Sequence, residues 1–270
     1  MARKRRTNLT IKIGQDLERR IMLRDSAIGG IVLECLGVQG SGKTSFMLSI
    51  VQDIISTYPD ELVFWRDSYF SQCQFNRFKK WKIHVAEGVN LQFKDIDKDK
   101  LVNVSKVVFN GFNELLEHAE PGLINVVYLQ NNHEYIDLIR YLRLYKGFQS
   151  LFIDEYEDIA PLRCAGEQWR KNEMLSNEFK HIRRGLVNLF CNTQNPSDVD
   201  WRVRSKIMCH AYLYGSKVDG QSPIKQGAVN NLKVGQWYMD YGFALFGKGK
   251  FGSYPPKSPV LIASDLNNGI

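Results

Sequence analysis

The sequence predicts an α/β fold in which a mostly parallel sheet carries helices on both faces. Two observations predict it. Short runs that are almost entirely apolar recur along the chain, as in strands buried on both faces of a parallel sheet. These runs alternate with segments whose apolar residues repeat at helical spacing. A length of 270 residues suits one such core with terminal segments or an insertion.

The first predicted strand is residues 31–36 (IVLECL), a continuous apolar run that ends at a glycine. A glycine-rich turn follows at 37–42 (GVQGSG). Residues 43–57 then place their apolar side chains on one face and predict a helix, which Pro59 closes. A second strand is expected at 62–65.

Residues 83–109 alternate apolar and polar side chains, a pattern typical of half-buried strands. We interpret residues 82–109 as a small antiparallel β insertion in the core.

The core resumes after this insertion. Further strands are expected at 123–129, 151–153, 186–191 and 207–214, helices at 133–145 and 167–184, and a hairpin at 237–246. The last segment, 254–270, holds three prolines and is expected to be an extended tail over the body or a neighbour.

Charge is concentrated at the start of the chain. The net charge is +7, and the first 24 residues hold eight Lys or Arg against two Asp or Glu. We interpret residues 1–25 as a basic arm, which fits either an anionic polymer such as DNA or a solvated tail that aids solubility. The sequence contains no run of eighteen apolar residues, so it predicts no membrane span. The basic residues 1–6 are not followed by the apolar segment of a secretory signal. We therefore expect a cytoplasmic protein.

Residues 37–44 (GVQGSGKT) match the complete pattern G-x-x-x-x-G-K-[ST] between a predicted strand and a predicted helix. Glycines let the backbone wrap around phosphate, and the N–H groups at a helix start attract anions. Lys43 is expected to neutralise the β- and γ-phosphates of ATP, and the Thr44 hydroxyl to bind Mg²⁺. The expected nucleotide contacts are Gly37, Gln39, Gly40, Ser41, Gly42, Lys43, Thr44 and Ser45.

Two carboxylates, Asp154 and Glu155, follow the apolar residues 151–153. Carboxylates at the end of a buried strand are costly unless they face a metal or a polar ligand. Asp154 is expected in the Mg²⁺ shell, and Glu155 is expected to orient and polarise the attacking water. A later predicted strand ends in polar residues, from which we choose Gln194 to sense the γ-phosphate or hold the water, with Asn192 in reserve.

With these motifs the chain resembles the HerA/FtsK superfamily of ring-forming P-loop motors, which includes DNA translocases, conjugative coupling ATPases and viral packaging ATPases. The resemblance rests on residues 37–44, the IDE at 153–155, the basic pair Arg183 and Arg184, and the TQNP at 193–196. It implies a RecA-like ATPase domain, set here at 26–253, in which the strand ending at Gln194 lies between the other two motif strands.

The resemblance also implies partners. It implies a homo-oligomer, expected to be a hexameric ring, that moves DNA in genome packaging or conjugative transfer. A viral capsid or transfer-complex protein is the further partner that it implies. An arginine of one subunit would reach the nucleotide of the next, which by position is Arg183 or Arg184, with Arg202 and Arg204 as alternatives. Residues 75–81 (FNRFKKW) offer DNA both charge and stacking, or are a surface strand or loop whose aromatics are buried.

Two other functions stay open. One is a small-molecule or nucleotide kinase, in which Arg183 and Arg184 would close over the donor phosphate of their own chain. A water-activating Glu155 speaks against it, since a kinase must exclude water. The other is a switch or assembly ATPase of the zonula occludens toxin type that translocates nothing.

Overall fold

The computed structural model describes residues 8–11, 21–25, 30–69, 71–145, 147–218, 222–240 and 246–266. Most of the predicted basic arm lies outside these residues. Within the arm, Asn8–Ile11 (β1) and Ile21–Asp25 (β2) pair as antiparallel strands.

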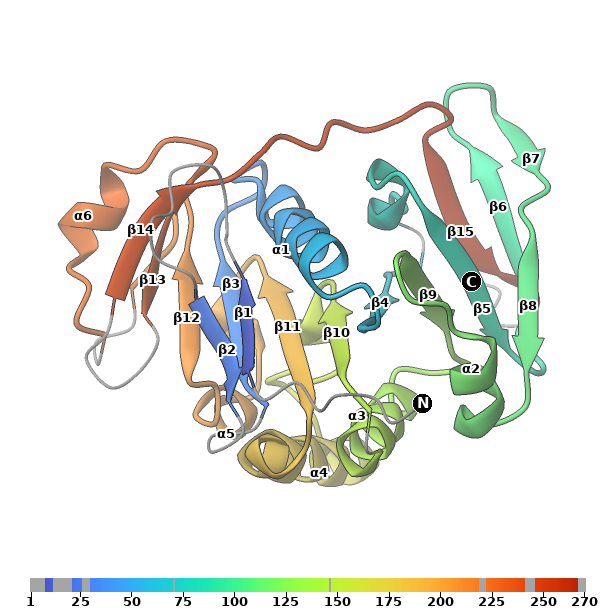
Figure 1. The fold of residues 1–270 in the computed structure, drawn as a ribbon, viewed down its shortest axis with the longest axis horizontal. Helices are drawn as coiled ribbons and strands as arrows, with labels where there is room; N and C mark the ends of the chain where they lie inside the picture. Colours follow the sequence, from blue (N-terminus) through green and yellow to red (C-terminus); the bar gives the residue numbers. More distant parts are fainter. Residues whose placement is uncertain are drawn as a thin grey trace.

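A ten-stranded sheet forms the centre of the molecule (Figure 1). Its strands, in spatial order, are β14 (Phe246–Lys250), β13 (Gln236–Asp240), β12 (Cys209–Tyr212), β3 (Val32–Leu36), β11 (Val187–Thr193), β10 (Gln149–Ile153), β4 (Leu62–Arg66), β9 (Ile124–Tyr128), β5 (Trp81–Ala86) and β8 (Lys106–Phe109). All neighbours from β12 to β8 are parallel, whereas β13 and β14 add an antiparallel edge. The predicted α/β fold class is confirmed.

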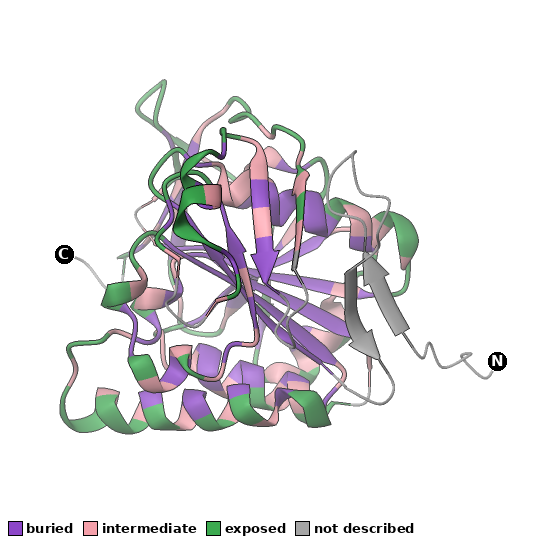
Figure 2. Ribbon diagram, turned by 90° about the vertical axis from the view of Figure 1, so that its left-hand side faces the viewer, coloured by how far each residue is buried: buried purple, intermediate pink, exposed green. Residues whose placement is uncertain are grey.

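Helices cover both faces of the sheet (Figure 2). One face carries α1 (Lys43–Thr57), and a second core on the opposite face holds side chains of α3 (Glu134–Leu144) and α4 (Gly166–His181). Residues 151–153 of β10 show why such strands end in apolar runs, because Phe152 packs in the α1 core while Leu151 and Ile153 pack in the other. The shorter helices are α2 (Phe112–His118), α5 (Trp201–Arg204), α6 (Gln226–Asn230), and the 3-10 turns η1 (Gln74–Arg77), η2 (Tyr156–Asp158), η3 (Ile182–Arg184) and η4 (Pro196–Asp198).

The predicted antiparallel insertion at 82–109 is only partly right. Strands β5 and β8 belong to the main sheet and run parallel, contrary to the prediction. Only β6 (Leu91–Asp95) and β7 (Lys100–Val102) form an antiparallel pair outside it. The alternating pattern of β8 arises because this strand is at the sheet edge and half exposed, and such a pattern reports burial rather than strand direction.

The C-terminal segment is also more ordered than an extended tail. Residues 251–260 cross the start of α1 from β14 towards β6 (Figure 1), and we call them the strap. The chain then forms β15 (Leu261–Asp265), which pairs with β6 as the third strand of the small sheet. None of the helices that the structure describes is long and apolar enough to cross a membrane.

Candidate active site

The glycine-rich loop at 37–44 joins β3 to α1, as predicted, at the carboxyl edge of the sheet. Gly40 and Gly42 have φ of +77° and +94°, a conformation that other residues rarely adopt. A side chain at Gly37 would place its Cβ 2.3 Å from Ser41 Oγ, so the loop closes on itself only with glycine there. Ser41 is buried, and its hydroxyl has no hydrogen-bond partner among the described residues.

Lys43 lies over this loop. Its ammonium group donates to the carbonyl oxygens of Gly37 at 2.8 Å and Val38 at 3.2 Å. Burial lowers the pKa of Lys43, and nearby carboxylates, Asp154 among them, partly offset that effect. A cation held by neutral carbonyls above a turn of backbone N–H groups is a site for a phosphate chain. The residues present therefore fit a nucleoside triphosphate.

Asp154 directly follows β10 and is buried beside the loop. Burial raises the pKa of Asp154 to about 6, an effect that the hydrogen bond from Asn192 Nδ2 partly reverses and the charge of Glu155 reinforces. A carboxylate under this cost gains from a metal cation. Asp154 therefore fits the predicted Mg²⁺ shell, with Thr44 in the first turn of α1 as its proposed companion.

Glu155 has a backbone conformation that is rare for a side-chain-bearing residue, with φ of +49°. Three hydrogen bonds hold its backbone. Its N–H donates to Asn192 Oδ1 at 3.0 Å, and its carbonyl oxygen accepts from Arg66 at 3.2 Å and from the Asp158 N–H at 3.1 Å. Strained backbone of this kind persists where the surroundings fix it, and it concentrates at functional sites. With this backbone conformation the carboxylates of the neighbouring residues Asp154 and Glu155 occupy separate positions, one against Asn192 and the other against Gln194.

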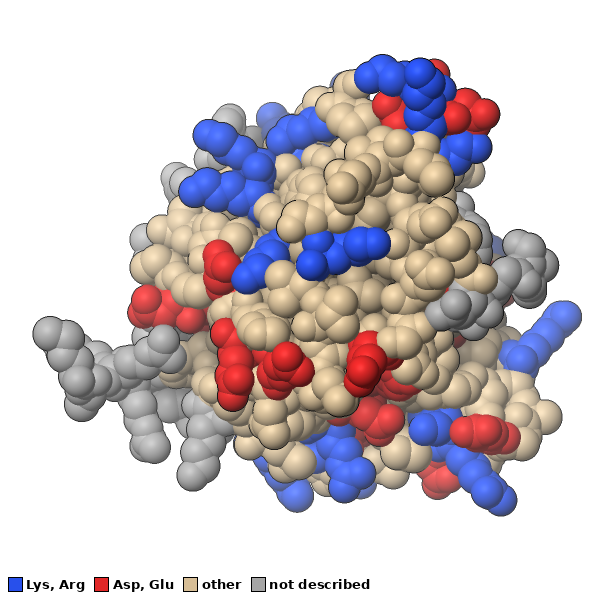
Figure 3. All heavy atoms as spheres, turned by 90° about the vertical axis from the view of Figure 1, so that its right-hand side faces the viewer, with Lys and Arg blue, Asp and Glu red and all other residues tan. Residues whose placement is uncertain are grey.

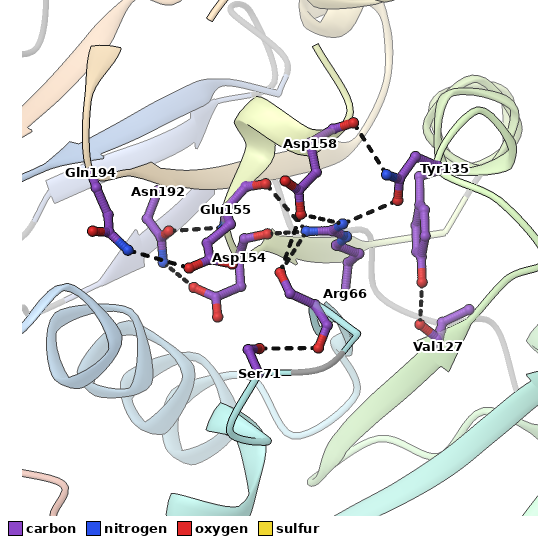
Figure 4. Close-up of polar contacts among 11 residues, drawn as sticks. Arg66, Ser71, Val127, Tyr135, Asp154, Glu155, Asp158, Asn192 and Gln194 are labelled. Carbon is purple, nitrogen blue, oxygen red and sulfur yellow. Dashed lines mark hydrogen bonds and ion pairs between the residues drawn. The ribbon is translucent and has the colours of Figure 1, made fainter. Parts of the chain in front are cut away.

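Gln194 follows β11 and donates from Nε2 to Glu155 Oε1 at 3.3 Å, so the predicted glutamine and the predicted water-activating acid meet (Figure 4). Asn192, the reserve choice, instead bonds the backbone of Glu155 and the carboxylate of Asp154. Strand β11 lies between β3 and β10, as the family resemblance implied. Three adjacent parallel strands thus bring the glycine-rich loop, the acid pair and Gln194 to one edge.

Arg66 is a site residue that the sequence reasoning missed. It ends β4, is 2% exposed, and donates to the carbonyl oxygens of Asp154 and Glu155 (Figure 4). Its other amino group pairs with Asp158 at 3.0 Å. The available signal was an arginine at the end of the apolar run 62–65, where a charge must find buried partners. Arg66 fixes the backbone that carries both candidate site acids.

Two more acids that the sequence reasoning missed lie close by. Burial, reinforced by the charge of Asp154, raises the pKa of Asp67 to about 8, and hydrogen bonds from Gln74 N–H and Tyr128 act in the opposite direction. Burial also raises the pKa of Glu157 to about 7. The site is therefore rich in acids that are costly to ionise, which favours a cation in their midst.

The structure places Arg183 and Arg184 away from the carboxyl edge of the sheet. They form η3, which precedes β11, so they lie at the amino edge. Seven strand residues separate the two edges, about 20 Å at the rise of a β-strand. The alternatives are engaged within the chain, because Arg202 pairs with Asp200 and Arg204 Nε lies 3.5 Å from Glu34 Oε1.

Residues 75–81 do not offer bases a stacking surface. Phe75 and Phe78 are buried, and Phe75 packs edge-on against Trp81 with ring centroids 5.1 Å apart. This result contradicts the predicted DNA contact by stacking, because the aromatics belong to the α1 core.

Comparisons with known proteins place the fold. No protein-family model matches the sequence, and no curated protein matches it. The DNA-packaging ATPase B204 from Sulfolobus Turreted Icosahedral Virus matches with a TM-score of 0.54 and 14% identity, over 84% of this chain and 100% of that chain. The genome packaging NTPase B204 from Sulfolobus turreted icosahedral virus 2, in complex with AMPPCP, gives 0.54 and 12%, over 83% and 98%.

The chain has the fold of a P-loop NTPase. At these identities the likeness shows the fold alone, and it confirms at that level the resemblance found in the motifs. The N-terminal domain of zonular occludens toxin from Neisseria meningitidis also matches, with a TM-score of 0.40 and 15% identity over 89% of this chain and 94% of that chain.

Proposed function

We propose that this chain is an ATPase that works as a homo-oligomeric ring, with six subunits expected, and moves DNA in genome packaging or conjugative-type transfer. One observation carries the ATPase part. The phosphate loop after β3, the acid pair after β10 and Gln194 after β11 meet at the carboxyl edge of three adjacent strands. This edge is where open α/β sheets bind their ligands.

Each residue has a separate task in hydrolysis. The loop N–H groups and Lys43 bind the phosphates and stabilise the charge that develops on them. Asp154 and Thr44 would hold Mg²⁺, which supplies further neutralisation of the phosphate oxygens. Glu155 accepts a hydrogen bond from the attacking water, and Gln194 holds the Glu155 carboxylate through its 3.3 Å hydrogen bond.

The positions of Arg183 and Arg184 argue against the kinase alternative. A kinase would use them on the nucleotide of their own chain, yet they lie at the opposite edge of the sheet. Both side chains are exposed, which leaves contact with a neighbouring subunit open to them. We retain them as the proposed trans-acting arginines on this ground.

The DNA part of the proposal is supported by the basic arm and by the similarity in fold to B204, a DNA-packaging ATPase. The face over β6, β7 and β8 does not add to it (Figure 3). There Lys94 pairs with Asp99 and Lys98 lies 3.7 Å from Asp95, so opposite charges alternate. Such a face lacks the single-signed field that a polyanion requires.

Exposed aromatic side chains lie elsewhere, on segments that follow the two catalytic strands. Trp201 is 70% exposed, and Trp169 is 47% exposed with the guanidinium of Arg202 lying 4.4 Å from its ring centroid. Aromatic rings and arginine planes stack on nucleic-acid bases irrespective of sequence. These residues replace 75–81 as the proposed stacking surface.

The ATPase proposal predicts that binding and chemistry separate in two variants. Lys43→Ala should lose tight ATP binding, because it removes the cation over the phosphates. Glu155→Gln should bind ATP with nearly the wild-type affinity and lose hydrolysis by about 10²–10⁴-fold, the usual contribution of a general base. Calorimetric binding and phosphate release measure the two effects. Near wild-type turnover in Glu155→Gln would remove Glu155 from the water.

The motor proposal is tested by sizing and kinetics together. The protein should form a larger, ring-sized species with ATP, and DNA should raise its ATPase rate. A monomer that ignores DNA and phosphorylates a small acceptor would select the kinase. A nucleotide-dependent assembly without DNA stimulation would select the switch ATPase.

A further inference from the structure

Arg77 is the residue of the 75–81 segment whose role the aromatic packing does not explain. It ends η1, and the buried rings of Phe75 and Phe78 on either side fix the local backbone. Its side chain is half-buried, and one guanidinium N–H donates to the carbonyl oxygen of Tyr254 at 3.3 Å. Tyr254 belongs to the strap.

The same strap residue touches the phosphate loop region. The N–H of Tyr254 donates to Ser45 Oγ at 3.3 Å, and Ser45 is one of the expected nucleotide contacts. Nearby, the ring of Phe251 packs on Phe46 with centroids 5.6 Å apart, and it lies 3.0 Å from the position that a Cβ on Gly42 would take. The strap therefore places Arg77 two hydrogen bonds away from the first turn of α1.

Arg77 carries a charge that no acid in the described part of the chain neutralises. No carboxylate among the residues that the structure describes forms an ion pair with it. Burial lowers the pKa of Arg77, and the negative charge of Asp154 acts in the opposite direction. Arginine stays charged in proteins, and a half-buried charge is stabilised by an anion with matching geometry.

We propose that Arg77 is a second phosphate-binding cation of the nucleotide site, acting within its own chain and oriented by the strap. The inference rests on the proposed ATPase function and names a residue that this function does not otherwise use. Phosphate is the anion it takes, because the planar fork of arginine binds two phosphate oxygens at once. The strap then connects the C-terminal strand β15 with nucleotide binding.

The test measures binding of a non-hydrolysable ATP analogue and of ADP to the full chain by calorimetry. Arg77→Ala and Arg77→Gln should both weaken the analogue by about 10–100-fold, as expected for a charged hydrogen bond, and weaken ADP less. Glutamine can still donate to the Tyr254 carbonyl, so it separates loss of charge from loss of the strap contact. Lys79→Ala, an exposed neighbour, is the matched control and should bind both nucleotides as the wild type does.

Two outcomes would overturn the inference. If Arg77→Gln binds the analogue normally while Arg77→Ala lowers both affinity and the melting temperature of the nucleotide-free protein, Arg77 only anchors the strap. If both variants bind nucleotide normally and lose DNA affinity, Arg77 is a DNA contact. In either case, analogue binding by the wild type that Lys43→Ala abolishes would leave the ATPase proposal standing, whereas no binding by the wild type would refute both.

Discussion

A single buried carboxylate shows how the site trades stability for function. Asp154 is 5% exposed, and its carboxylate accepts from the amide of Asn192. The cations that act on it, Arg66 and Lys43, are themselves engaged, Arg66 with Asp158 and backbone carbonyls and Lys43 with loop carbonyls. Without a metal, ionised Asp154 thus costs folding free energy, and a bound cation returns it.

This cost predicts a pH-dependent effect of Asp154→Asn in the absence of Mg²⁺ and nucleotide. The pKa of Asp154 is raised by burial from its ordinary 3.8 to about 6, so the folded state holds the proton more tightly. Its penalty is therefore absent below pH 4, grows as pH rises to 6, and is complete above 6. A shift of this size is worth about 3 kcal/mol, or roughly 6–12 °C in melting temperature for a chain of this length.

Asp154→Asn should accordingly melt higher than the wild type at pH 8 and at a similar temperature at pH 4. Scanning calorimetry across this range measures the difference. Adding Mg²⁺ and ATP should stabilise the wild type and leave the variant nearly unchanged. A variant that melts lower than the wild type at pH 8 would show that Asp154 is a structural residue rather than a metal ligand.

The sequence alone identifies the residues that belong to a recognisable local motif. Lys43, Asp154 and Glu155 stand in such patterns, and the structure brings the two acids together with Gln194. Arg66 carries no such pattern, since its partners come from residues that lie far along the chain. Its role depends on β4 and β10 being neighbours, which no local sequence signal states.

Among the elements, the sequence predicts burial better than pairing. The helix predicted at 43–57 has exactly these bounds in α1, because the glycine loop and Pro59 delimit it. In the sequence, the prolines before residues 261–265 favour an extended tail over a strand. Its alternation of buried Leu261, Ala263 and Asp265 with half-buried residues becomes a strand only through pairing with β6, more than 160 residues away in the sequence.

The pairing of β15 predicts a stability difference between two neighbouring residues. Leu261 is 3% exposed and packs in the α1 core, whereas Ile262 is on the opposite, half-buried face. Leu261→Ala should lower the free energy of unfolding by about 2–5 kcal/mol, the usual range for a large-to-small core substitution. Ile262→Ala is the matched control and should cost clearly less. Equal losses in urea unfolding would show that β15 does not pack as described.

At the scale of the whole molecule, the proposal gives the two edges of the sheet different tasks. The carboxyl edge holds the candidate nucleotide site, and the amino edge carries Arg183 and Arg184 on the exposed turn η3. A separation of about 20 Å excludes them from the site of their own chain. In the proposed ring, a subunit that binds ATP at one edge and offers arginines at the other would need a neighbour for both to meet. Such a heterologous contact is of the kind that closes rings.

Mixing inactive subunits tests this arrangement. Subunits with Arg183→Ala or Arg184→Ala should bind ATP and hydrolyse it about 10³–10⁵-fold more slowly, because an arginine supplied in trans contributes about that much. Mixed with Lys43→Ala subunits, they should regain some hydrolysis at interfaces that pair an intact phosphate loop with an intact arginine. Phosphate release is measured after sizing shows that the mixture assembles. Assembled mixtures without recovered turnover would contradict the trans assignment. An arginine that merely caps its own helix stabilises it by only about 0.3–1 kcal/mol and cannot be complemented by another subunit. Only an arginine that completes a neighbour's site can be complemented in this way.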